Sequence, residues 1–116
     1  MGKRKISNNN QSVISDASEQ QIRQTHAEIA DQSGEPPELD LHGQTGQEAA
    51  LNVYGYVTRM ADSGELCCRI IYGRGTGVLQ QVVAKEISEL AEQNIIATYF
   101  QSQKYPGAAI VVVFPV

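Results

Sequence analysis

The chain has 116 residues, of which 41% are hydrophobic, so it can build one domain of ordinary size and little more. No stretch approaches the roughly 20 apolar residues of a membrane span, and the polar run after the basic start argues against a secretory signal, which predicts a cytoplasmic protein. The net charge is −4, so any binding to nucleic-acid phosphates has to be local, or helped by Lys3, Arg4 and Lys5.

The first 36 residues differ in composition from the rest of the chain. Residues 8–12 are polar and of low complexity, and residues 33–37 (Ser-Gly-Glu-Pro-Pro) have the composition of a linker. We therefore predict a mostly disordered tail and linker over residues 1–36 and a folded domain over residues 37–116. The tail could serve as a docking segment for a protein partner or as a second contact for nucleic acid.

A short helix inside this tail is the alternative. Ser18 and Gln21 have the spacing of a capping box, and Ile22, Ile29 and Ala30 fall on one helical face. This face carries too little apolar surface for such a helix to be stable alone.

The rest of the chain alternates short apolar strands with amphipathic helices. The expected elements, in chain order, are a strand at 38–42, a helix at 44–62, a strand at 66–72, a helix at 78–93, and strands at 95–101 and 108–114. Two βαβ crossovers require parallel strands, and the short last connection requires an antiparallel pair. The order β-α-β-α-β-β therefore predicts an α/β (α+β) fold, a two-layer sandwich with both helices on one face of a four-stranded mixed sheet.

The two cysteines, Cys67 and Cys68, are neighbours in a predicted strand. Neighbours in a strand point to opposite faces, so we expect two buried free thiols and no disulfide. They do not have zinc-ligand spacing, and the other nitrogen ligands are only His26 and His42, so we assign no metal site.

The first candidate motif is Leu-Asp-Leu-His-Gly at residues 39–43. Strand alternation places Asp40 and His42 on the face opposite the two leucines, at the end of the first strand. An acid beside an imidazole can orient and activate a general base. The alternative is that Asp40 pairs locally and that His42 is a partly exposed residue at the end of a strand.

The second candidate motif is Gly-Arg-Gly-Thr-Gly at residues 73–77, which runs directly into the second helix of the domain. Its glycines let the backbone approach a ligand closely, and the helix start is a natural anion site. Thr76 is the expected N-cap, and Arg74 is placed to hold a phosphate bidentately. The alternative is a glycine-rich turn that binds nothing. The loops after the first two strands should meet at one edge of the sheet.

Together the two motifs resemble the small MutS-related (Smr) domain family. Residues 39–43 match the opening LDLHG motif of that family, and residues 71–79 (Ile-Tyr-Gly-Arg-Gly-Thr-Gly-Val-Leu) resemble its second motif, HGKGTG-x-L. The resemblance implies a sandwich similar to the C-terminal domain of translation initiation factor three. It also implies nucleic-acid binding and, in some members, DNA nicking or RNA cleavage. The family roles fall on Asp40, His42, Gly73, Arg74 and Gly75.

The sequence departs from the family pattern at two places. Tyr72 replaces the histidine that opens the second motif, so this domain could bind without cutting, while the tyrosine ring could stack on a base. Residues 103–107, before the last strand, keep only one glycine of a loop that is often glycine-rich in the family.

The leading hypothesis is a nucleic-acid-binding domain that could also be a DNA-nicking or RNA-cleaving endonuclease, assisted by a divalent metal such as Mg²⁺. Asp40 and His42 would be catalytic, and phosphate and bases would be bound by Tyr72, Gly73, Arg74, Gly75, Thr76 and Gly77, with Tyr105 as a further stacking residue. The rival hypothesis is a non-catalytic nucleic-acid-binding or protein-interaction module. A third is a pocket for a small anion or a mononucleotide.

Overall fold

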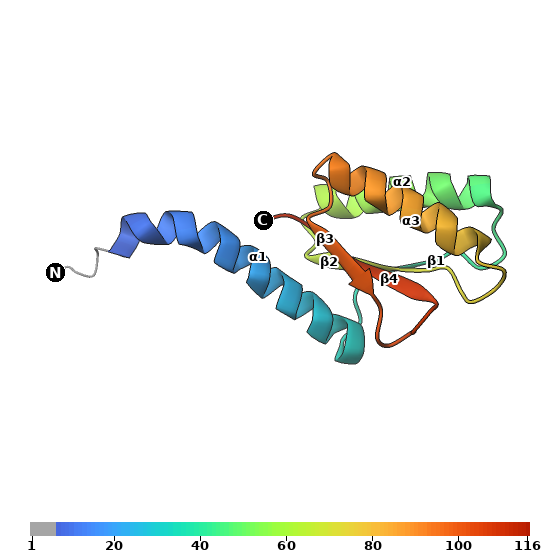
Figure 1. Ribbon diagram of the computed structural model, residues 1–116, viewed down its shortest axis with the longest axis horizontal. Helices are drawn as coiled ribbons and strands as arrows, with labels where there is room; N and C mark the ends of the chain where they lie inside the picture. The colour runs from blue at the N-terminus through green and yellow to red at the C-terminus, as the bar shows by residue number, and fades with distance from the viewer. Residues whose placement is uncertain (1–6) are drawn as a thin grey trace.

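The computed structural model describes residues 7–116, with side chains from Ser18 onward (Figure 1). Lys3, Arg4 and Lys5 lie outside the described residues. The elements, in chain order, are α1 (Ser7–Ser33), β1 (Glu38–Asp40), α2 (Gly46–Asp62), β2 (Cys67–Ile71), α3 (Val78–Glu92), β3 (Thr98–Gln101) and β4 (Ala109–Val113). No helix in this part of the chain is both long and apolar enough to span a membrane.

The four strands form the predicted mixed sheet, in the order β1-β2-β4-β3. β1 pairs parallel with β2, and β4 pairs antiparallel with both β2 and β3. The second crossover, from β2 through α3 to β3, therefore skips one strand position, so β2 and β3 are not hydrogen-bonded neighbours. The burial pattern explains this order. Every residue of β4 is buried, as a central strand requires, whereas β3 alternates between half-buried and exposed residues, as an edge strand does.

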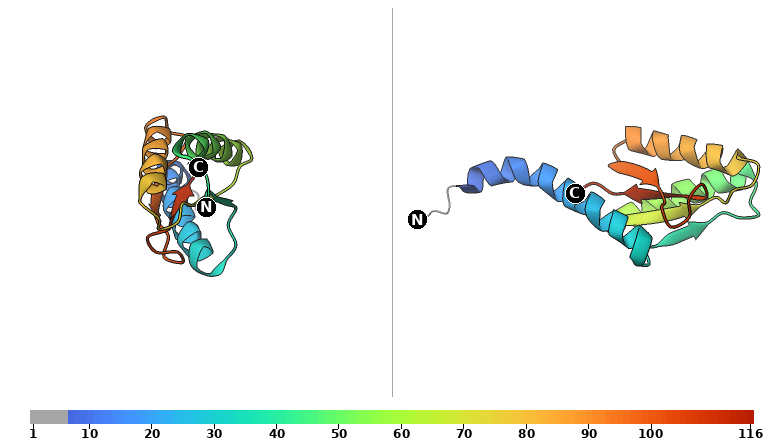
Figure 2. Two further views of the ribbon diagram at one scale, coloured as in Figure 1. Left: turned by 90° about the vertical axis from the view of Figure 1, so that its right-hand side faces the viewer. Right: turned by 60° about the horizontal axis from the view of Figure 1, so that its bottom comes forward.

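α2 and α3 cover one face of the sheet, as predicted (Figures 1 and 2). Their buried positions recur at helical spacing: Ala49, Val53 and Val57 in α2, and Val83, Ile87 and Leu90 in α3. α2 begins with a complete capping box, in which the Thr45 side chain and the Glu48 side chain each accept a hydrogen bond from the backbone of the other.

α1 lies against the opposite face of the sheet, so the prediction of a mostly disordered tail differs from the structure (Figures 1 and 2). A second, smaller core forms there between Ala27 of α1 and the outer face of β2 and β4, at Cys67, Val111 and Val113. These strand residues are apolar and need a cover, and a helix that is too polar to be stable alone becomes stable when it supplies that cover. α1 is a partial third layer beside the predicted two.

The expected short helix in this region also differs from α1 in its start and its buried face. α1 begins at Ser7, so Ser18 is inside the helix and is not its cap. Ile22 and Ile29 are exposed, and the buried face is formed instead by small and polar residues, of which Ala27 and Asp31 are fully buried.

Cys67 and Cys68 are free and buried, and they belong to different cores, as their alternation in the strand predicts. Cys68 packs under α2 and α3, and Cys67 packs under α1. Burial raises the pKa of both thiols, so both stay protonated and unreactive at neutral pH.

Candidate functional site

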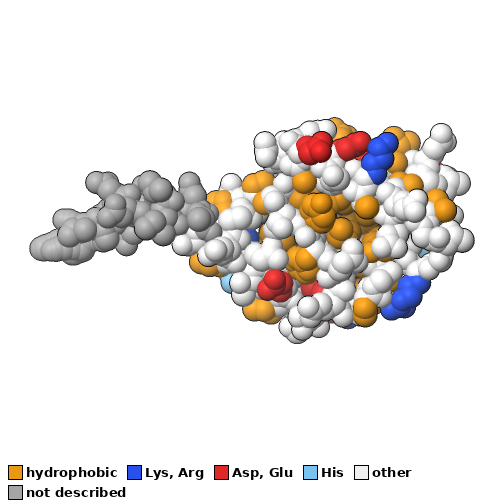
Figure 3. Space-filling model, in the orientation of Figure 1, with side chains coloured by type: hydrophobic (Ala, Val, Ile, Leu, Met, Phe, Trp, Pro, Cys, Tyr) orange, Lys and Arg blue, Asp and Glu red, His pale blue; other side chains and the backbone are white. Residues whose placement is uncertain are grey.

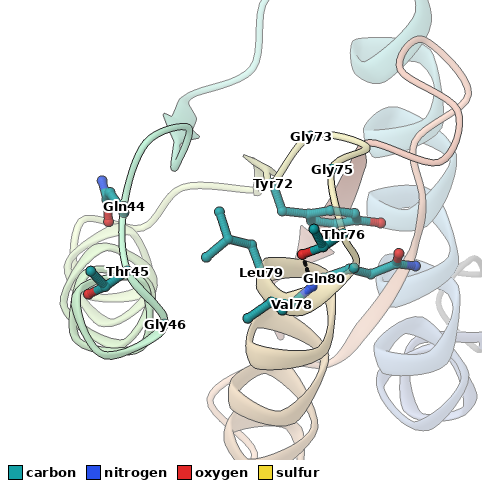
Figure 4. A pocket seen from close by; sticks show the side chains of 11 residues that line it. Gln44, Thr45, Gly46, Tyr72, Gly73, Gly75, Thr76, Val78, Leu79 and Gln80 are labelled. Carbon is teal, nitrogen blue, oxygen red and sulfur yellow. Dashed lines mark hydrogen bonds between the residues drawn. The ribbon is translucent and has the colours of Figure 1, made fainter.

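The loops that follow β1 and β2 meet at one edge of the sheet, because these two strands are parallel. Between them lies a cavity of about 310 Å³, which we call the loop pocket. It is lined by residues 44–46 after β1 and by residues 72, 73 and 75–80, which connect β2 to the first turn of α3. Figure 4 shows Gln44 and Thr45 on one side of the loop pocket, and Tyr72, Thr76 and Leu79 on the other.

The glycines at the two ends of the second motif are required by the backbone conformation. Gly73 and Gly77 have φ values of 79° and 92°, which side-chain-bearing residues rarely adopt, although no atom lies within 4 Å of a Cβ built at either position. The backbone is therefore in the left-handed region just before Arg74 and just after Thr76, and these two bends direct the chain into α3.

The start of α3 has no capping side chain. Gly77, and not the predicted Thr76, is the N-cap, and it makes no side-chain hydrogen bond to the first turn. Thr76 Oγ1 accepts only a long contact of 3.5 Å from the amide of Val78. A glycine takes the cap position because the backbone there is left-handed. The first-turn amides and the positive end of the helix dipole are therefore left for an anion at the loop pocket.

Arg74 is exposed at the edge of this site and does not line the loop pocket. One terminal nitrogen, Nη2, donates to the carbonyl oxygen of Pro106 at 2.6 Å, in the connection between β3 and β4. A guanidinium has five N–H donors. This single bond therefore leaves several of them for a phosphate.

Asp40 is the last residue of β1 and His42 follows two positions later; their side chains lie side by side, and neither lines the loop pocket. Asp40 Oδ1 accepts a hydrogen bond of 3.0 Å from the His42 backbone amide and lies 3.4 Å from His42 Nδ1. The His42 side chain is 89% exposed. The carboxylate faces one ring nitrogen, so the other, Nε2, is free to meet a ligand. The structure thus has the predicted pair, at the same edge as the loop pocket but outside it.

The two tyrosines expected to stack on bases are placed differently from the prediction. Tyr72 is only 5% exposed, its hydroxyl donates to Gln101 Oε1 at 3.0 Å, and burial raises its pKa. Its ring is part of the core wall, so it is not an open stacking surface in this conformation. The ring of Tyr105 is half-buried, and the guanidinium of Arg69 lies 4.9 Å from its centre, so one face of this ring is already occupied.

Sequence reasoning did not single out Gln44, which lines the loop pocket. Its side-chain Oε1 accepts a hydrogen bond of 2.8 Å from Asn52 Nδ2, which fixes the amide at the mouth of the pocket. The available signal was its position directly after the LDLHG motif, in a loop that parallel pairing brings beside residues 73–77.

None of the residues that line the loop pocket has a charged side chain. On the face shown in Figure 3, the visible Lys and Arg side chains are few and separate, and they form no continuous basic patch. Among the residues whose side chains are described, no three His, Cys, Asp or Glu side chains gather into a group that could hold a metal ion. Any electrostatic attraction of an anion to this edge therefore has to come from backbone amides, the start of α3 and Arg74.

A four-stranded mixed sheet with two helices on one face, and with the two motifs at the ends of its parallel strands, defines a small α/β domain of the Smr type. The Smr domain family matches residues 39–114, and the chain belongs to this family. The match confirms the resemblance seen in the two motifs. It covers all elements except α1 and the first residue of β1.

Known proteins resemble this chain over about two thirds of its length. The chain is 31% identical over 80 residues to the ribosome rescue factor SmrB of Shewanella baltica strains OS155 and OS185, which covers 67% of this chain and 44% of each relative. The chain thus spans less than half the length of these relatives. The crystal structure of the Smr domain of Thermus thermophilus MutS2 superposes with a TM-score of 0.59 and 26% identity, over 69% of this chain and 99% of that domain.

Proposed function

We propose that this domain binds nucleic acid by seating a backbone phosphate at the loop pocket. The observation that carries the proposal is the uncapped start of α3, which opens onto a pocket between the loops of two parallel strands. The glycine backbone of residues 73–77 lets the phosphate approach closely, and the exposed Arg74 in the same loop, with donors left over from its bond to Pro106, would add a charged contact. A relative named as a ribosome rescue factor supports a partner that contains RNA.

The binding site is tested by an Arg74→Ala substitution. Fluorescence anisotropy with labelled single-stranded RNA and DNA should show an affinity loss of about tenfold, and the slope of log affinity against log salt should fall by about one. Arg59→Ala is the matched control, since Arg59 is exposed in the last turn of α2, at the end of that helix away from the pocket. Equal affinities and slopes for the two variants would contradict the placement of the phosphate.

A small-anion pocket predicts a different result in the same assay. A mononucleotide would then compete for the site as well as an oligonucleotide does. Nucleic-acid binding predicts that affinity rises with strand length, because each further phosphate adds a contact.

Cleavage is a second candidate function, favoured by the exposed Asp40 and His42 pair at the same edge. His42 Nε2 would take a proton from a water molecule as the water oxygen bonds to phosphorus. The bond from phosphorus to the leaving oxygen would break, and that oxygen would take up a proton from solvent. Asp40 would hold the imidazole through Nδ1. Asp40 is also the carboxylate that could ligate Mg²⁺, with water and phosphate oxygens filling the other positions, and the cation would neutralise charge on the phosphate.

The cleavage experiment compares the wild type with an Asp40→Ala, His42→Ala double variant on labelled RNA and on supercoiled plasmid, with Mg²⁺, with Mn²⁺ and with chelator. Products from the wild type only would assign a nuclease to this pair and give its metal dependence. Intact substrates under every condition would leave a binding module. The buried Tyr72 at the position of the family histidine favours that outcome.

A further inference from the structure

α1 is joined to the sheet by a buried carboxylate. Asp31, in the last turn of α1, is 1% exposed, and its two oxygens accept hydrogen bonds from Arg69 Nη1 at 2.9 Å, Ser102 Oγ at 2.7 Å and the Gln103 amide at 2.8 Å. Arg69 is itself buried and also pairs with Glu38 of β1. Burial by itself raises the pKa of Asp31, but these hydrogen bonds outweigh it and lower the pKa, so the carboxylate is charged at neutral pH.

Two of the partners of Asp31, Ser102 and Gln103, belong to the connection between β3 and β4, residues 102–108, which we call the linking loop. Ser102 Oγ donates to Asp31 and also accepts from the Tyr105 amide at 3.1 Å, so it joins α1 to the middle of the loop. The Tyr105 ring lies against the Arg69 guanidinium. The conformation of the linking loop is therefore set from the α1 side of the sheet.

The far end of the linking loop makes hydrogen bonds to the second motif and to Tyr72 just before it. The carbonyl oxygen of Ala108 accepts from the amides of Tyr72 at 2.8 Å and Gly73 at 3.0 Å, and the carbonyl of Pro106 accepts from Arg74. An ideal Cβ on Gly107 would lie 3.7 Å from Arg74 Nε, so the loop and the arginine are in contact. The backbone entry to the motif and the direction of its arginine are both fixed by this loop.

We propose that Asp31 is a positioning residue for the nucleic-acid site, acting through Ser102 and the linking loop on Gly73 and Arg74. α1 lies outside the part of the chain that matches the Smr family, so this role adds a segment to the site. The effect on binding rests on the proposed function, whereas the effect on the geometry of the motif does not.

Ser102→Ala tests the connection most directly, because it removes the hydroxyl between Asp31 and the Tyr105 amide and keeps the pairing of Asp31 with Arg69. In ¹H–¹⁵N NMR spectra, we expect the signals of the Gly73 amide and the Arg74 Nε–H to shift relative to the wild type. Cys67→Ala is the matched control, since it weakens the contact of α1 with the sheet within the small apolar core, at a residue outside the hydrogen bonds that join Asp31 to the linking loop. Unchanged Gly73 and Arg74 signals in Ser102→Ala would overturn the proposal.

Binding of the labelled RNA then measures the consequence for function. Ser102→Ala should weaken binding about threefold to tenfold, and should have little further effect when Arg74 is already alanine, because Ser102 acts on binding through the position of Arg74. Cys67→Ala should lower Tm and keep the affinity. Equal losses with and without Arg74 would assign Ser102 a purely structural role and overturn the positioning of Arg74. If Arg74→Ala itself leaves binding unchanged while the NMR signals shift, the placement of the phosphate fails and the geometric coupling stands.

Discussion

The two faces of the sheet are covered by different physical means. Under α2 and α3, fourteen buried residues in the described part of the chain form a continuous core. Under α1 only four do so, and beside them lies the buried pair of Asp31 and Arg69 with its hydrogen bonds. The first face is stabilised by the burial of many apolar groups, and the second by a few polar contacts that depend on one another. The second face should therefore be more sensitive to the loss of a single polar group and to pH.

The largest expected effect comes from breaking the polar face. Asp31→Ala leaves Arg69 with only Glu38 as a charged partner, and we expect it to reduce the free energy of unfolding by about 3 kcal/mol. Urea unfolding followed by circular dichroism measures the loss. Glu28→Ala, an exposed acid one turn earlier on α1, is the control and should change stability by less than about 0.5 kcal/mol. Similar values for the two variants would mean that the buried pair is not what holds α1.

A smaller effect compares two neighbours on β4. Val112 packs under α2 and α3, and Val111 packs under α1, and both are fully buried. We expect Val112→Ala to cost about 2 kcal/mol and Val111→Ala about 1 kcal/mol, since α1 can move to close the space and the larger core cannot. The same urea titration gives both values. A greater loss at Val111 would show that the α1 face is packed as rigidly as the other.

The smallest effect is a pH dependence confined to the α1 face. The pKa of Asp31 is lowered in the folded protein, so its ionised form stabilises the fold at pH values above the unfolded pKa of about 4, and this contribution is lost as the pH falls through the lower folded pKa. Urea unfolding between pH 3 and pH 7 should show stability falling below about pH 4. Asp31→Asn should flatten this fall, and an identical slope in the two proteins would assign the acid sensitivity to other carboxylates.

The face of the sheet covered by α2 and α3 could be predicted in full, because apolar residues at helical spacing and apolar strands indicate burial directly. The order of these elements also predicted that the loops after β1 and β2 meet at one edge of the sheet, where the loop pocket lies. Strand order was harder, since only the complete burial of β4 places it between β2 and β3.

The α1 face and part of the site could not be predicted, for physical reasons that particular residues make clear. Asp31 and Arg69 look like solvent-exposed residues in a sequence, because a buried pair is visible only once both partners are placed. The two isoleucines of α1 pointed to the wrong helical face. Tyr72 was assigned to stacking on its residue type alone, although it continues the buried run of β2.

The two adjacent cysteines lie on opposite faces of the sheet, so the exposure of each thiol can be measured as a sign that its face has lost its cover. A thiol reagent meets neither side chain in the intact fold. Detachment of α1 would uncover Cys67 and leave Cys68 under α2 and α3, whereas global unfolding would uncover both. Counting modified thiols by mass spectrometry would therefore distinguish a chain that has released its first helix from a chain that has unfolded, without any introduced label.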